Sequence, residues 1–121
     1  MKFDSIKVPI LNDEYYVVVC WGDQGTAKKY ITKHTSGAAK FCELDDDRGT
    51  CWFNEDFTYM PIIYINLTVK DRRFYGTLAH EACHAINAMW KRLGEASRDE
   101  IFAYSVGAIV GAVEKRVKRC G

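Results

Sequence analysis

The chain lacks a long apolar run, an export signal and a strong net charge. Its longest nearly apolar stretch covers residues 101–113, which is too short to cross a bilayer and favours a buried helix. Residues 1–5 (MKFDS) contain no apolar core of a secretory signal. The formal net charge of +1 provides no field that would draw the whole molecule to nucleic acid or to a membrane. We therefore expect a cytoplasmic protein with no nucleic-acid or membrane partner.

The number and spacing of the cysteines argue against a framework of disulfides. The five cysteines are an odd number and form no CxxC pair, which favours reduced thiols inside a cell. A disulfide between Cys42 and Cys51, which flank a predicted turn, is possible but not favoured. The one local charge bias is the basic run 115–119 (KRVKR). We interpret it as cations that offset the negative end of a helix, in preference to a nucleic-acid contact.

The length of 121 residues predicts a single domain, residues 1–121, because no repeat and no linker rich in proline, glycine or serine divides the chain. A chain of this length buries roughly two-thirds of its unfolded surface on folding. With 48% apolar and 27% charged residues, the composition is that of an ordinary globular protein. The sequence is long enough for one hydrophobic core.

The first half of the chain is predicted to form mainly strands. Residues 2–10 alternate between apolar and polar side chains, and residues 15–21 are a dense run of β-branched and aromatic side chains. A short helix is expected over residues 23–33, with Asp23 as its N-cap. Residues 40–44 and 50–53 then have the pattern of a hairpin.

The second half is predicted to form one strand and two long helices. Residues 62–69 alternate clearly, which is typical of a strand. A helix is expected over residues 71–93, with Asp71 as its N-cap. The segment 97–100 (SRDE) has the form of a capping box, and it opens a last helix over residues 98–119. The predicted fold is α+β, a small mixed sheet with both C-terminal helices packed on one face.

The segment His80–His84 (HEACH) carries the clearest chemical signal. Histidines four residues apart lie on one face of a helix, so both imidazoles can reach a single zinc ion. Glu81 lies about 100° further round the helix, where its carboxylate can take a proton from a zinc-activated water. The segment therefore predicts a hydrolytic zinc site with Glu81 as the general base.

A catalytic zinc ion usually has three protein ligands and one open position. A metzincin would provide a histidine at position 90, where this chain has Trp90, so that class is excluded. His34, the one remaining histidine, is interpreted as a surface residue. The better candidates are Glu100 and, less favoured, Asp99. Glu100 shares a helix face with small residues that allow close helix approach, but it also fits the capping box as the residue that reaches back to its N-cap.

An HExxH motif followed by a helix that bears a glutamate resembles the gluzincin branch of the zincin metallopeptidases, in a minimal single-domain form. The resemblance covers about residues 60–112, including the order of strand and helix before His80. It implies a zincin-like fold in which His80, His84 and Glu100 bind zinc and Glu81 is the general base and acid. Fifteen residues separate His84 from Glu100, a few less than in the larger gluzincins.

Several other residues are predicted to surround the site. In zincins the strand before the metal helix forms a rim on which an extended peptide can pair, so residues 62–68 either fill this role or form an ordinary interior strand. Tyr104 either stabilises the oxyanion of the reaction or is a buried tyrosine bonded to the backbone. Thr77 and Asn87 lie near the histidine face and could orient the imidazole rings.

These patterns predict a zinc metallopeptidase that hydrolyses an amide bond in a peptide or protein substrate. A deformylase is disfavoured, because the chain lacks the glutamine before the motif and the segment that carries a cysteine ligand. The alternative from another class is a catalytically inactive, zinc-stabilised protein-interaction module. A structural zinc site prefers four protein ligands, whereas this chain offers three good ones at most, which favours the enzyme.

Overall fold

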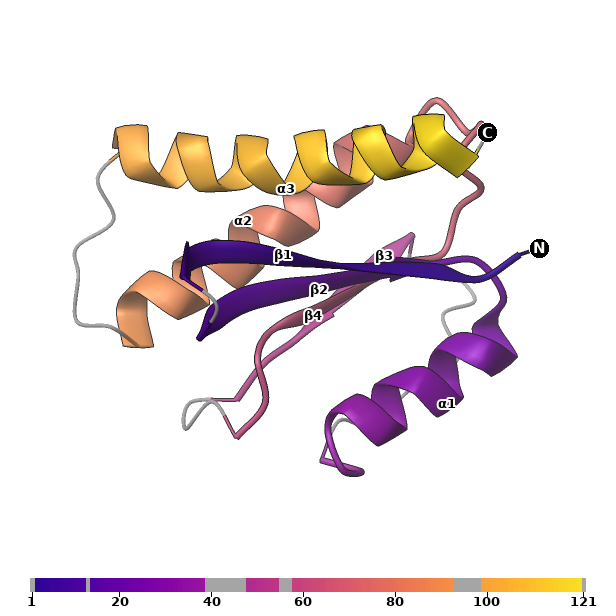
Figure 1. Cartoon of the computed structure of the whole chain (residues 1–121), viewed down its shortest axis with the longest axis horizontal. Coiled ribbons are helices and arrows are strands. Elements are labelled where there is room, and N and C mark those ends of the chain that lie inside the picture. The colour runs from indigo at the N-terminus through magenta and orange to yellow at the C-terminus, as the bar shows by residue number, and fades with distance from the viewer. Residues whose placement is uncertain (1, 13, 39–47, 55–57, 93–98, 121) are drawn as a thin grey trace.

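The computed structural model describes residues 2–12, 14–38, 48–54, 58–92 and 99–120. In these residues the chain forms one sheet and three helices, so the α+β prediction is confirmed (Figure 1). The elements, in chain order, are β1 (Asp4–Asn12), β2 (Tyr15–Trp21), α1 (Gln24–His34), β3 (Gly49–Trp52), β4 (Ile62–Ile65), α2 (Phe74–Arg92) and α3 (Asp99–Cys120).

The sheet is mixed, and its strand order is β1-β2-β4-β3. β1 and β2 form an antiparallel hairpin, β2 and β4 are parallel, and β3 pairs with β4 in the antiparallel sense. All four residues of β4 are buried, and both of its edges are paired. Of the two alternatives for residues 62–68, the interior strand is therefore correct for β4, and the rim is wrong. Among the described strands, β3 lies at the edge of the sheet on this side.

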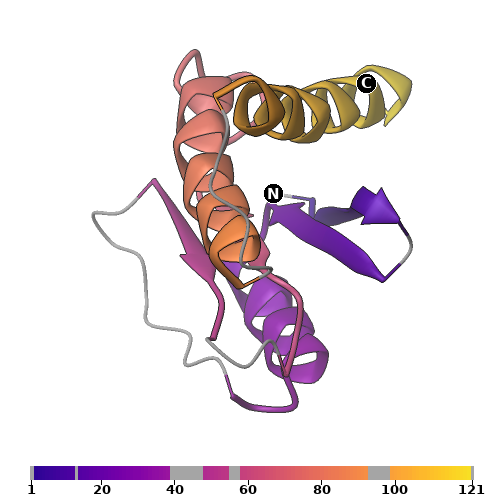
Figure 2. The ribbon, with the colours of Figure 1, turned by 90° about the vertical axis from the view of Figure 1, so that its left-hand side faces the viewer.

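The helices cover the two faces of the sheet unequally. Figures 1 and 2 show α2 and α3 on one face and α1 on the other. Successive residues of each inner strand divide between the two layers, as a period of two requires. Ile63 and Ile65 belong to the cluster that α2 and α3 cover, whereas Ile62 and Tyr64 belong to the cluster under α1. The alternation predicted for this strand is confirmed.

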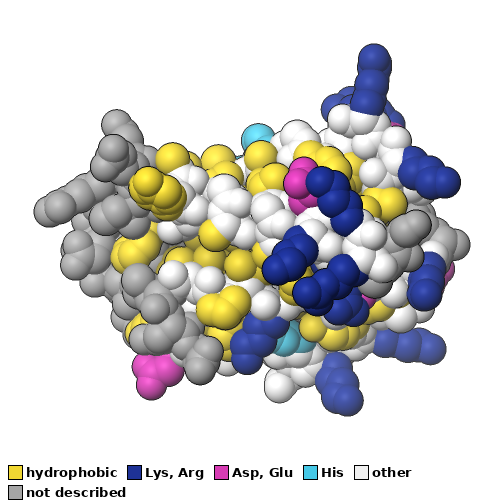
Figure 3. All heavy atoms as spheres, turned by 45° about the horizontal axis from the view of Figure 1, so that its top comes forward, with side chains coloured by type: hydrophobic (Ala, Val, Ile, Leu, Met, Phe, Trp, Pro, Cys, Tyr) yellow, Lys and Arg dark blue, Asp and Glu magenta, His cyan; other side chains and the backbone are white. Residues whose placement is uncertain are grey.

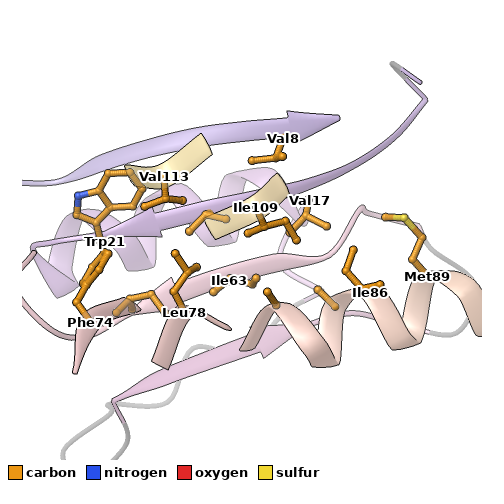
Figure 4. Packing of buried hydrophobic residues seen from close by; sticks show 14 of the residues in the cluster. Val8, Val17, Trp21, Ile63, Phe74, Leu78, Ile86, Met89, Ile109 and Val113 are labelled. Carbon is orange, nitrogen blue, oxygen red and sulfur yellow. The ribbon is translucent and has the colours of Figure 1, made fainter. Parts of the chain in front are cut away.

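The larger core lies between the sheet and the two C-terminal helices (Figure 4). Phe74 at the start of α2 meets Trp21 edge to face, with ring centroids 6.1 Å apart. Ile109 and Val113 of α3 are also buried in this cluster. Burial of side chains of this size contributes roughly 1.5–3 kcal/mol each. The core therefore fixes the sheet-facing side of α2 and leaves its opposite side available.

The N-cap predicted for the first helix is confirmed. The Asp23 carboxylate accepts a hydrogen bond of 2.9 Å from the backbone N–H of Thr26, and α1 begins at the next residue, Gln24. Ala27 and Ile31, one turn apart, are its buried residues. The other predicted cap is wrong in part, because α2 begins at Phe74 and not at Asp71. The Asp71 carboxylate instead accepts the N–H of Arg73 in the turn before the helix.

The strand β4 is shorter than predicted and ends at Ile65. The next side chain, Asn66, accepts a hydrogen bond from Gln24 at 3.1 Å, and the turn that follows has the N–H of Asp71 bonded to the carbonyl of Thr68. The strand therefore ends at Ile65, whereas Leu67 and Val69 still pack against the same cluster as Ile63 and Ile65. The predicted strand at residues 40–44, with Cys42, and the predicted N-cap at residue 97 lie outside the described residues.

The basic run near the C-terminus forms local ion pairs. Arg116 lies 3.1 Å from Asp4 of β1, and Lys118 lies 3.3 Å from Glu114 on the same helix. Figure 3 shows the lysine and arginine side chains gathered on the right-hand half of the view, the half in which α3 ends. The cations at the end of α3 also offset its negative pole, as the sequence predicts. In the described part of the chain, no helix is both long and apolar enough to cross a membrane.

Candidate metal centre

The site lies on the side of α2 that faces away from the core. His80 and His84 are exposed, one turn apart, whereas Leu78, Ala82 and Ile86 are fully buried on the opposite side. Glu81 lies between these two sides and is only 7% exposed. An amphipathic helix thus explains the arrangement: its apolar stripe packs on the core, and the candidate metal ligands occupy the outer face.

The two histidines are arranged for a shared ion. Their Nε2 atoms lie 3.3 Å apart and their rings are nearly perpendicular, at 75°. Two nitrogen ligands at 2.0–2.1 Å from one tetrahedral zinc ion would be about 3.3–3.4 Å apart. The ligand atoms of His80, Glu81 and His84 all lie within 4.8 Å of one another. The separation of the two nitrogens is therefore the one that two ligands of a single zinc ion would have.

A pocket surrounds this group, and the lining that the structure describes comes from two elements and the residues that flank them. One wall is β3 with the residues that flank it, and the other is the first half of α2 together with the residue before it. The lining residues are Arg48, Gly49, Thr50, Cys51, Phe53, Arg73, Gly76, Thr77, His80, Glu81 and His84. The edge strand β3 and the helix α2 therefore enclose the site between them.

The close approach of these two walls depends on Gly49. A Cβ atom at this position would lie 3.0 Å from Thr77 Cγ2 and 3.2 Å from Glu81 Cγ. Both distances are shorter than ordinary contacts between carbon atoms. The absence of a side chain at Gly49 thus lets the start of β3 lie directly against Glu81, which accounts for the burial of this carboxylate.

Cys51 lies further along the same wall. Burial, and then the charge of Glu81, raise the pKa of the Cys51 thiol to about 12. The thiol is therefore neutral at physiological pH and lacks the thiolate form that a nucleophile requires. It is also a free cysteine, which agrees with the expectation of reduced thiols at this position.

The structure brings together three of the predicted site residues, His80, Glu81 and His84, and adds Thr77 to the pocket wall. Asn87 is exposed and is not among the lining residues. The interpretation of His34 as a surface residue is wrong in part, because it is half-buried. It packs on the other face of the sheet, where it stacks on Tyr30.

The predicted residues of the last helix are less closely tied to the site. Asp99 and Glu100 lie in the first turn of α3, but their side chains are outside the described part. Tyr104 is 79% exposed, so the alternative of a buried tyrosine is wrong. No described side chain of α3 lines the pocket. The third ligand and the role of Tyr104 stay predictions.

The wall formed by β3 and its flanking residues could hardly be predicted from the sequence. The residues Arg48, Gly49 and Cys51 show no motif, and a predicted strand at 50–53 does not reveal which helix lies beside it. One signal does stand out in the sequence: Arg72 and Arg73 directly precede α2, and its first turn has no acidic residue. Cations are disfavoured at this end of a helix.

Comparison of the chain with models of protein families, with curated proteins and with solved structures found no match. A function for this chain is therefore inferred from the geometry of the site.

Proposed function

We propose that this protein is a zinc-dependent hydrolase of the zincin type, most simply a peptidase that cleaves an amide bond. The observation that carries the proposal is the 3.3 Å separation of the His80 and His84 Nε2 atoms beside the carboxylate of Glu81. A zinc ion held there would supply a Lewis acid and lower the pKa of a water molecule to near 7. Three of the five residues in the motif thus supply both ligands and a base.

Glu81 has the position that a general base and acid needs. Its carboxylate lies within 4.8 Å of the ligand atoms of both histidines and faces the pocket. It would accept a proton from water as the carbonyl is attacked and would then donate that proton to the leaving amine. Its contact with Gly49 limits its motion, and an oriented carboxylate is more effective than a mobile one.

We assign the third ligand to Glu100, with Asp99 as the less favoured candidate. Both residues begin α3, which packs against α2 in the shared core. With two histidines and one carboxylate as ligands, the fourth position of the zinc ion stays open for water or substrate, which suits catalysis. Tyr104, one turn after Glu100, would stabilise the oxyanion in this arrangement.

The edge of β3 offers a place for an extended substrate. The carbonyl of Arg48 accepts the N–H of Asn66, so the backbone of Arg48 and Thr50 points toward β4. By alternation, the N–H and C=O groups of Gly49 and Cys51 point to the outer edge of the sheet. A peptide that pairs there would run alongside Glu81 and the histidines, with affinity from its main chain.

The alternative is a catalytically inactive module in which zinc only stabilises the protein for an interaction. The same histidine pair supports metal binding in both cases. The observation that favours an enzyme is Glu81, which is largely buried within the pocket yet belongs to the group around the histidines. A carboxylate in this position has an evident role in hydrolysis and none in a purely structural site.

The metal content of the purified protein tests the proposal. A separation of 3.3 Å also suits a direct hydrogen bond between the two neutral imidazoles. Elemental mass spectrometry distinguishes a bound zinc ion from such a hydrogen bond. We expect about one zinc ion per chain, lost in His80→Ala and retained in the matched control His34→Ala. If the wild-type protein contains no zinc and takes none up, the hydrolase proposal is wrong.

A further inference from the structure

The described lining of the pocket carries more positively than negatively charged side chains, the histidines aside. Its described lining includes two arginines, Arg48 and Arg73, and one carboxylate, Glu81. Both arginines lie where β3 begins and α2 begins, at the same end of the pocket. A bound zinc ion would add two further positive charges. The electrostatic character of the pocket therefore favours a substrate that carries a negative group.

Arg73 is held in a fixed orientation. Its Nε and Nη2 atoms donate to the two carboxylate oxygens of Asp71 at 3.0 and 2.8 Å, and its side chain is still 46% exposed. Arg48 lies close enough that its charge helps to lower the pKa of Asp71. Among the described residues, the two guanidinium groups therefore lie near one carboxylate, that of Asp71, whose charge is smaller than that of the two together.

The position of these arginines contradicts the usual distribution of charge along a helix. Arg73 directly precedes the first residue of α2, and no acidic residue stands in the first turn. Cations at this end of a helix are unfavourable, because the N-terminal end of the helix dipole is positive. The ion pair with Asp71 offsets this effect in part, and positions that depart from a local rule are often functional. The edge strand brings a second arginine to the same place.

We propose that Arg48 and Arg73 bind a carboxylate of the substrate, so that the protein prefers acidic peptides. This proposal rests on the proposed hydrolase function and names its substrate class. A guanidinium group binds a carboxylate through paired, charge-assisted hydrogen bonds. Arg48 has the more available side chain, since Arg73 is already bonded to Asp71.

The geometry limits where this carboxylate lies in the substrate. Gly49 lies against Glu81, and Arg48 is the residue before it. Residues in a strand advance by about 3.3 Å, so a peptide paired with β3 places its residue opposite Arg48 only one or two positions from the bond beside Glu81. The carboxylate belongs either to an Asp or Glu side chain at that position or to the C-terminus of a short substrate.

Binding to the Glu81→Gln variant tests the subsite without turnover. Fluorescently labelled peptide pairs, identical except for Asp against Asn at each position, are titrated and followed by anisotropy. A second pair compares a free C-terminus with an amidated one, which separates the two sources of the carboxylate. In one of these pairs, we expect the acidic peptide to bind about 3- to 10-fold more tightly than the neutral peptide, and added salt should weaken this preference.

Matched variants locate the effect in Glu81→Gln protein. Arg48→Gln should remove the acidic preference and Arg73→Gln should reduce it, whereas Arg72→Gln, the same charge change at an exposed residue outside the pocket lining, should retain it. No preference in any pair, or an equal loss with Arg72→Gln, would overturn the subsite. Zinc content is measured on the same samples. A preference that persists in protein unable to bind zinc supports the subsite and refutes the hydrolase.

Discussion

Gly49 and Glu81 lie in direct contact, with the place of a Cβ on Gly49 only 3.2 Å from Glu81 Cγ. The same Cβ would also meet Thr77 Cγ2 at 3.0 Å and Ile65 Cδ1 at 3.1 Å. The start of β3 and this turn of α2 thus leave no room for a methyl group between them. The burial of the proposed base is a consequence of a residue that no motif identifies.

Gly49→Ala should therefore lower stability and displace Glu81. Insertion of one methyl group into a filled contact costs about 1–3 kcal/mol, measured by urea unfolding. We expect zinc content to be retained and kcat to fall. Gly76→Ala is the matched control, because a Cβ there meets nothing within 4 Å, and alanine in a helix should stabilise by about 0.5–1 kcal/mol. If the two variants behave alike, the contact has no effect.

The histidine pair of the candidate site could be predicted from the sequence, whereas the wall opposite it could not. Residues four apart on a helix necessarily share a face, so His80 and His84 are placed by local geometry alone. Gly49 and Arg48 reach the site through the order of strands, since β3 becomes the edge only after β4 inserts between it and β2. No local pattern specifies such an insertion.

The same distinction applies to the fold. Alternation correctly divided Ile63 and Ile65 from Ile62 and Tyr64, because the period of a strand is a local property. The end of β4 at Ile65 could not be predicted in this way, because the alternation continues past it, with Leu67 and Val69 still packed against the same cluster. The start of α2 was missed because a carboxylate before a helix can cap the turn as well as the helix.

Glu81→Gln should retain zinc and lose hydrolysis. Glutamine has nearly the same shape but cannot accept the proton, so the ligands His80 and His84 are unaffected and the base is lost. We expect kcat to fall by about 100-fold or more, the usual contribution of general base catalysis. Cleavage of a peptide library and zinc content are measured on the same preparation. Full activity with unchanged zinc would remove Glu81 from the mechanism.

Glu100→Ala and Asp99→Asn separate the two candidates for the third ligand. Loss of a zinc ligand weakens binding far more than loss of a helix-capping contact, which costs about 1 kcal/mol. We expect the zinc dissociation constant to rise by at least about 10-fold in Glu100→Ala and to stay near the wild-type value in Asp99→Asn. Competition with a chelator gives both constants. The reverse order would assign the ligand to Asp99.

Tyr64 gives a prediction for alkaline pH that is independent of the zinc site. Its hydroxyl donates a 2.6 Å hydrogen bond to the Gly22 carbonyl. Burial, followed by the effects of Cys20 and Asp23, raises the pKa of Tyr64 from 10.0 to about 12. The folded protein thus favours the protonated tyrosine more than the unfolded chain does. This stabilisation is fully present below pH 10 and is lost as the pH rises from about 10 to 12.

Tyr64→Phe should therefore be less stable than the wild type near neutral pH, by about 1–2 kcal/mol, because the Gly22 carbonyl loses its donor. The difference should shrink as the pH rises through the same range, since phenylalanine has no proton to lose. Urea unfolding at about pH 7, 9, 10 and 11 measures both the loss of stability and its dependence on pH. Tyr104→Phe, at a side chain that is 79% exposed, should change neither the free energy of unfolding nor its dependence on pH. A constant difference at every pH would show that Tyr64 stabilises only by packing.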